Sequence, residues 1–134
     1  MLLCMTSYEP EVDGEPDPGE VVWAWVPYEE DATQGKDRPV LIIGRHEVDG
    51  AQWWAGLPLT SKDHDRDMEQ EASEGRHWMD VGTGAWDREG RPSEVRLDRL
   101  VMVPDANIRR EGAALDRAIF DEVLAEARKL HAIT

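Results

Sequence analysis

Short apolar runs separated by polar, turn-forming segments make up most of this chain, a pattern that predicts strands rather than long helices. The predicted strands cover residues 19–26, 39–45, 52–59, 77–81 and 93–103, the last as one bent strand or two short ones, and the polar segments 27–37 and 62–75 are predicted as loops. The dipeptide Asp49-Gly50 is a strong hairpin signal, and Gly44 marks a possible bulge. In the first strand, alternation places Val22 on one face and Trp23 on the other.

Helical periodicity is clear only near the C-terminus, where we predict a helix over residues 116–131. Asp116 suits the N-cap position, and Leu115 and Phe120 have the spacing of a hydrophobic staple. The expected apolar face consists of Ile119, Phe120, Val123, Leu124, Ala127 and Leu130. Together these elements predict a mainly β protein, a small and strongly bent β-barrel with a C-terminal α-helix.

Acidic residues are concentrated at the N-terminus, where we predict a disordered tail over residues 1–18. One domain follows over residues 19–134. The formal net charge is −14, and residues 1–20 contribute −6 of it through six Asp and Glu and no Lys or Arg. Such a charge disfavours non-specific binding to nucleic acid.

Cysteine content and hydropathy bear on the compartment. The single cysteine, Cys4, excludes an internal disulfide and fits a reducing cytoplasm, where we expect the protein to act. We expect no membrane association, because no run approaches the roughly 18 apolar residues of a membrane helix and the N-terminus lacks the features of a secretory signal. Either Met1 or Met5 fits as the start of translation.

Polar side chains stand at three places where a predicted strand begins or ends. Arg38, followed by the stiffening Pro39, precedes the run 40–43; Thr60 and Ser61 follow the run 53–59; and Arg96 and Asp98 precede the run 100–103. Guanidinium, hydroxyl and carboxylate groups at strand ends are what a metal-free site for a phosphodiester needs. The structural alternatives are an ion pair of Arg38 with Asp98, and turn chemistry for Thr60 and Ser61.

Four segments together resemble the PemK/MazF toxins, the ribonuclease halves of bacterial type II toxin–antitoxin pairs. They are residues 18–23 (PGEVVW), 35–41 (GKDRPVL), 57–61 (LPLTS) and 95–98 (VRLD), and the resemblance covers residues 18–134. It implies an SH3-like barrel, a homodimer, and metal-independent, sequence-selective cleavage of single-stranded mRNA. It also implies a cognate antitoxin whose extended tail covers the RNA site.

The resemblance also implies roles for single residues in an attack of the RNA 2′-hydroxyl on the adjacent phosphorus. The catalytic set is Arg38, Thr60, Arg96 and Asp98, with Ser61, Gln34 and Lys36 assigned to substrate binding. The arginines suit phosphate binding because a guanidinium stays charged, which leaves Asp98 as the expected base. Some PemK relatives carry a histidine in the first loop, but residues 28–35 of this chain contain none.

Other interpretations remain open. Asp63, Asp65, Asp67 and Glu74 have the spacing of a calcium loop, but Met68 occupies the position that requires glycine, so we expect no metal and no cofactor. Trp53, Trp54 and Trp78 fit base stacking, core packing or dimer contacts. The alternative function is a non-cleaving barrel toxin of the gyrase-poison kind, or a degenerate, regulatory member that binds proteins; the net charge favours the latter.

Overall fold

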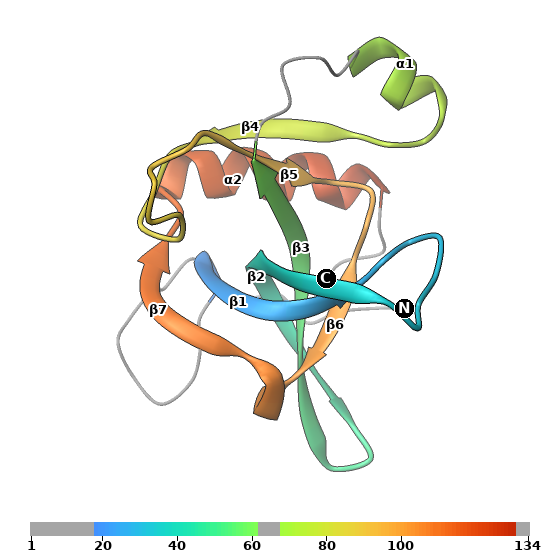
Figure 1. Ribbon diagram of the computed structural model, residues 1–134, viewed down its shortest axis with the longest axis vertical. Coiled ribbons are helices and arrows are strands. Elements are labelled where there is room, and N and C mark those ends of the chain that lie inside the picture. Colours follow the sequence, from blue (N-terminus) through green and yellow to red (C-terminus); the bar gives the residue numbers. More distant parts are fainter. Residues whose placement is uncertain (1–17, 62–67, 131–134) are drawn as a thin grey trace.

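The computed structural model describes residues 18–61 and 68–130 (Figure 1). Its elements are β1 (Glu20–Pro27), β2 (Gly35–Val48), β3 (Ala51–Ser61), α1 (Met68–Ser73), β4 (Trp78–Gly82), β5 (Ser93–Arg96), β6 (Val101–Pro104), the 3₁₀ turn η1 (Asp105–Asn107), β7 (Arg109–Ala114) and α2 (Arg117–Leu130). The predicted acidic tail lies outside the described residues except for Pro18, and so do Cys4 and the spaced acids Asp63, Asp65 and Asp67.

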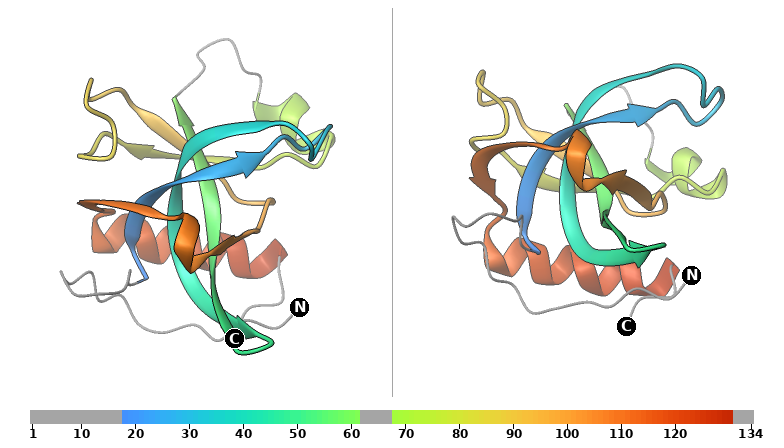
Figure 2. Two further views of the ribbon diagram at one scale, coloured as in Figure 1. Left: turned by 60° about the horizontal axis from the view of Figure 1, so that its bottom comes forward. Right: turned by 90° about the horizontal axis from the view of Figure 1, so that it is seen from below.

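Strand β3 organises the sheet, whose order is β4-β5-β3-β2-β1-β7 with antiparallel pairing throughout. One edge of β3 pairs with β2, whereas the other edge pairs first with β6 and then with β5. A strand shared in this way must bend, and the sheet curls into the half-barrel seen in Figure 2. The predicted mainly β fold with a C-terminal helix is confirmed.

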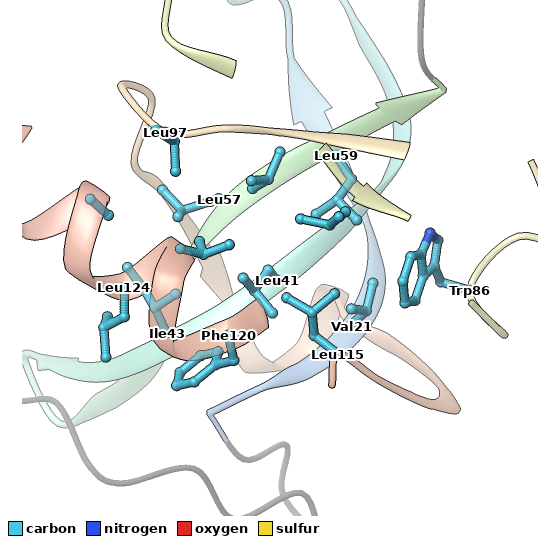
Figure 3. Packing of buried hydrophobic residues seen from close by; sticks show 14 of the residues in the cluster. Val21, Leu41, Ile43, Leu57, Leu59, Trp86, Leu97, Leu115, Phe120 and Leu124 are labelled. Carbon is cyan, nitrogen blue, oxygen red and sulfur yellow. The ribbon is translucent and has the colours of Figure 1, made fainter. Parts of the chain in front are cut away.

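Two buried clusters fill the two faces of this curled sheet. Residues 40–43 of β2 are all fully buried because successive side chains enter different clusters. One cluster contains Val22, Ala24, Val26, Val40, Ile42, Trp54, Val101 and Val103. The other includes Leu41 and Ile43 and is covered by α2, as Figures 1 and 3 show.

Helix α2 packs through the apolar face that the sequence predicts, with one exception. Phe120, Val123, Leu124 and Ala127 are buried, whereas Leu130 keeps 43% of its surface exposed. The buried Leu115 lies in the same cluster as Phe120, as expected for a hydrophobic staple (Figure 3).

The β2–β3 hairpin turns at Asp49-Gly50, as predicted. Both residues have the left-handed backbone that a tight hairpin turn requires, with φ of 52° and 81°. The predicted irregularity near Gly44 is also present, because the β2–β3 register shifts between Ile42 and Gly44.

Three predicted boundaries or elements were wrong. Strand β2 begins at Gly35, not at residue 39, so the first loop is shorter than predicted. Strand β7 was not predicted because its sequence RREGAA lacks apolar alternation. Arg110 of β7 donates two hydrogen bonds of 2.7 Å to the buried Glu20 of β1, and these bonds attach β7 to the sheet. Helix α1 lies within the predicted loop 62–75, since a six-residue polar helix leaves no hydrophobic period.

No helix within the described residues is both long and apolar enough to span a membrane.

Candidate functional site: an arginine-lined pocket

Strands β2, β3, β4 and β5 meet around one pocket of about 150 Å³. It is lined by Arg38 of β2, by Pro58, Leu59 and Thr60 of β3, by Trp78 of β4, by Arg96 of β5 and by Arg99, which follows β5. Three of the predicted site residues, Arg38, Thr60 and Arg96, therefore come together. The described lining carries three guanidinium groups and no carboxylate, so the pocket suits an anion.

Strand register explains why residues so distant in sequence meet here. The β2–β3 register, continued beyond its last pair, places Arg38 opposite Thr60. On the other edge of β3, Thr60 pairs with Glu94 of β5, two residues before Arg96. The central strand thus brings Thr60 between the two strands that carry Arg38 and Arg96.

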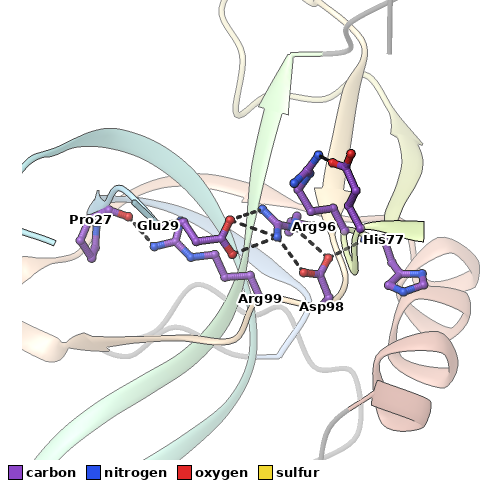
Figure 4. Close-up of polar contacts among 8 residues, drawn as sticks. Pro27, Glu29, His77, Arg96, Asp98 and Arg99 are labelled. Carbon is purple, nitrogen blue, oxygen red and sulfur yellow. Dashed lines mark hydrogen bonds and ion pairs between the residues drawn. The ribbon is translucent and has the colours of Figure 1, made fainter. Parts of the chain in front are cut away.

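Arg96 is held from three sides (Figure 4). Its Nε and Nη2 donate hydrogen bonds of 2.8 Å to the two carboxylate oxygens of Asp98. Its Nη1 and Nη2 donate to Glu29, on the β1–β2 loop, over 3.0 to 3.3 Å. The guanidinium also lies 5.4 Å from the ring centroid of Trp78, within cation–π range. With only 10% of its side chain exposed, Arg96 depends on these partners in place of water.

Asp98 accepts hydrogen bonds from Arg96 and does not itself line the pocket. Its Oδ1 accepts hydrogen bonds from Arg96 Nε and, at 2.6 Å, from the backbone N–H of His77. Burial raises the pKa of Asp98, but the hydrogen bonds from Arg96 and His77 together outweigh burial, so the pKa lies below its ordinary value. A low-pKa carboxylate with a 15% exposed side chain is a better anchor for Arg96 than an acceptor of a substrate proton.

Arg38 and Arg99 supply the pocket's uncompensated charge. Within the described residues no carboxylate forms an ion pair with either one, and Arg99 donates to the backbone carbonyl of Pro27. Burial lowers the pKa of Arg38, and the positive charge of Arg99 lowers it further, against opposing effects of Tyr28 and Glu30; the guanidinium still remains charged. A bound anion would relieve the repulsion between the two cations.

The remaining predicted site residues lie outside the pocket lining. Gln34 and Lys36 are exposed, on the β1–β2 loop and at the start of β2, and Ser61 is exposed at the end of β3. The backbone of Gln34 closes the loop, since its carbonyl accepts from the N–H of Tyr28 at 2.8 Å. The alternative of a structural Arg38–Asp98 ion pair is wrong, because Asp98 pairs with Arg96 instead.

Sequence reasoning did not assign three residues to this site. Arg99 directly follows the Arg-x-Asp motif, which was the available signal. Trp78 contacts Arg96 and lines the pocket, whereas Trp54 is a core residue, 2% exposed, whose Nε1 donates to Asp105 at 2.8 Å. Glu29 reaches Arg96 from 67 positions away in the chain, and no sequence pattern signals that contact.

Across residues 18–61 and 68–130, no group of three or more His, Cys, Asp or Glu side chains is arranged to hold a metal ion. The pocket offers hydrogen-bond donors, chiefly guanidinium groups, which can stabilise negative charge on phosphate oxygens.

Comparison with known proteins identifies the class. The family model for the PemK-like, MazF-like toxin of type II toxin-antitoxin systems matches residues 17–131. The match spans most of the chain, and the protein belongs to this family, whose members are generally endoribonucleases.

A comparison with solved structures agrees with the family match. A chain in the crystal structure of MazE-MazF (Form-II) from Deinococcus radiodurans is similar with a TM-score of 0.50 and 23% sequence identity, covering 88% of this chain and 94% of that chain. At this identity the likeness shows the shared fold, and with the family match it confirms the predicted MazF-like barrel. No curated protein sequence matches the chain.

The contacts of Asp98 predict how stability depends on pH. Its folded-state pKa is lowered, so its contribution is fully present above the pKa of the unfolded carboxyl, about 4, and is lost as pH falls through the folded-state value. Asp98→Asn should therefore lower the free energy of unfolding at neutral pH by about 1–3 kcal/mol, the range for losing a charged hydrogen-bond partner. The difference in the free energy of unfolding between wild type and Asp98→Asn should become smaller at acidic pH.

Urea unfolding monitored by tryptophan fluorescence at several pH values measures this effect. Asp49→Asn makes the same chemical change at an exposed turn, where asparagine also tolerates the left-handed backbone, and it should leave stability unchanged. Equal stability of wild type and Asp98→Asn at neutral pH would contradict the anchoring role.

Proposed function

We propose that this protein is the toxin of a toxin–antitoxin pair and a metal-independent endoribonuclease that cleaves single-stranded mRNA in the cytoplasm. The observation that carries the proposal is the pocket lined together by Arg38, Arg96, Arg99 and Thr60. Membership of a family of generally endoribonucleolytic toxins supports it.

In this proposal the scissile phosphate enters the pocket. The forked guanidinium of Arg38 binds the non-bridging oxygens, Arg99 adds positive charge, and the Thr60 hydroxyl donates a further hydrogen bond. Arg96, whose charge Asp98 and Glu29 offset, forms part of the pocket wall beside the phosphate. Charge on these oxygens grows as the 2′-oxygen attacks phosphorus, so preorganised donors bind the transition state more tightly than the ground state. Ser61, Gln34 and Lys36, outside the lining, would contact adjacent nucleotides.

The net charge of −14 is compatible with RNA binding if positive charge is concentrated at the site. The pocket has this property, because its described lining bears only cationic charge. The acidic surface elsewhere would repel RNA and so favour productive over non-specific contacts. The alternative function, a non-cleaving family member that binds protein, is favoured by the same net charge and is decided by the cleavage assay below.

The proposal includes a cognate antitoxin that competes with RNA for the pocket. The similar solved chain comes from a MazE-MazF crystal structure, which supports an antitoxin partner. A carboxylate-bearing segment would suit three arginines as well as a phosphate does. Competition binding between antitoxin and RNA tests this part.

The proposal further includes a homodimer, with exposed apolar side chains as candidate contacts. Trp25 and Leu130 retain 48% and 43% of their surface exposed, more than large apolar groups in this core. Light scattering at micromolar concentration should give twice the chain mass. A single species of 15.2 kDa would contradict the dimer.

The decisive assay incubates the purified protein with mixed-sequence single-stranded RNA in EDTA and maps the new ends. We expect cleavage that leaves a 2′,3′-cyclic phosphate and a 5′-hydroxyl. Arg38→Ala should slow it by about 10²–10³, the loss typical of removing one oxyanion-type donor, with an unchanged melting temperature.

Arg45→Ala is the matched control, because this exposed arginine lies further along β2 and does not line the pocket. It should cleave at the wild-type rate. Cleavage that requires an added divalent metal would refute the mechanism, and absence of cleavage under all conditions would favour the protein-binding alternative.

A further inference from the structure

The proposed reaction needs a group that removes the proton from the RNA 2′-hydroxyl, and arginines cannot supply it. Such a base must reach the pocket, retain a free lone pair and be accessible to substrate. The following inference rests on the proposed function and concerns which side chain meets these conditions.

Glu29, like Asp98, does not itself line the pocket but contacts Arg96, which does. Its Oε2 accepts a hydrogen bond from Arg96 Nη2 at 3.0 Å, and its Oε1 accepts from Nη1 and Nη2 at 3.3 Å each. These bonds are longer than the 2.8 Å bonds that Asp98 accepts from the same guanidinium. Glu29 is therefore the more loosely held of the two carboxylates.

Glu29 is also the more accessible carboxylate. Its side chain is 54% exposed, against 15% for Asp98. Each carboxylate accepts three hydrogen bonds, two of them on one oxygen, so exposure and bond length are what distinguish Glu29 from Asp98. A carboxylate has about four acceptor positions, and the exposure of the Glu29 side chain leaves the remaining position accessible to a substrate hydroxyl.

The loop carrying Glu29 can present it to a substrate. It connects β1 to β2 and ends immediately before the strand that contributes Arg38. Figure 4 shows the Glu29 carboxylate between Arg96 and the Arg99 side chain, whereas the His77 ring lies on the far side of Asp98. His77 is thus directed away from the place where Glu29 sits.

We propose that Glu29 is the catalytic base of the reaction and that Asp98 positions Arg96. A Glu29 oxygen takes the proton of the 2′-hydroxyl as the bond between the 2′-oxygen and phosphorus forms. The bond from phosphorus to the 5′-oxygen breaks, and the departing oxygen takes a proton from water. The products are the 2′,3′-cyclic phosphate and the 5′-hydroxyl, and Glu29 returns its proton to solvent.

Single-turnover kinetics of Glu29→Gln in EDTA test the assignment. The amide keeps the shape of the side chain but cannot accept the proton, so the cleavage rate should fall about 10²–10⁴-fold. Binding of a 2′-deoxy oligonucleotide of the cleaved sequence, which lacks the nucleophile, should be as tight as for wild type or tighter. Glu29→Asp, which restores a carboxylate, should recover part of the rate.

Two variants serve as controls. Glu47→Gln removes the same charge from an exposed position of β2 that does not line the pocket, and it should cleave at the wild-type rate. Asp98→Asn should weaken binding of the 2′-deoxy oligonucleotide, because it loosens Arg96.

Each contrary outcome has a distinct meaning. If wild type does not cut RNA in EDTA, the proposed function itself fails. If wild type cuts and Glu29→Gln cuts equally fast or faster, Glu29 is not the base. A faster rate would mean that the Glu29 carboxylate competes with the substrate phosphate for Arg96. Equal losses in Glu29→Gln and Glu47→Gln, or a rate loss matched by lost binding, would also overturn the assignment.

Discussion

The burial of Arg96 is the constraint on which the candidate site depends. A guanidinium that is 10% exposed needs compensating acceptors, and the chain supplies Asp98 two residues later and Glu29 from a distant loop. Because Asp98 also binds the His77 backbone, the same network fixes the chain leading into β4. Removing Arg96 would leave two neighbouring carboxylates without their shared cation, so the arginine and its partners form a unit.

Charge is divided within this unit in a way that suggests a function. The carboxylates sit behind and beside Arg96, while Arg38 and Arg99 face the pocket without a carboxylate partner among the described residues. The result is a small cationic pocket on a protein of net charge −14. A site of this kind attracts a phosphate locally while the rest of the surface repels polyanions.

Much of the fold and of the candidate site could be predicted from the sequence, wherever local sequence signals agree with the fold. The apolar runs beside Arg38 and Thr60 identify the strands that carry these residues, and the pairing of those strands brings the two residues together. The Arg-x-Asp spacing likewise indicates that Arg96 belongs to the site. The SH3-like barrel and the helix follow from periodicity and from the family resemblance.

The rest could not be predicted because it depends on contacts between distant segments. Strand β7 is defined by pairing with β1 and by Glu20–Arg110, not by its own composition. The base role first assigned to Asp98 rested on motif position, whereas its hydrogen bonds, visible only in three dimensions, favour anchoring. For the same reason no pattern indicated Glu29, whose contact with Arg96 spans 67 positions.

The central claim is that this pocket binds a phosphodiester, and NMR of the arginine side chains tests it most directly. The Nε–H signals of Arg38, Arg96 and Arg99 would be followed while a single-stranded 2′-deoxy oligonucleotide is added. Saturable shifts at these three arginines, with Arg45 unchanged, are the predicted result. Shifts confined to arginines outside the pocket, such as Arg88 or Arg91, or no shifts at all, would contradict the account.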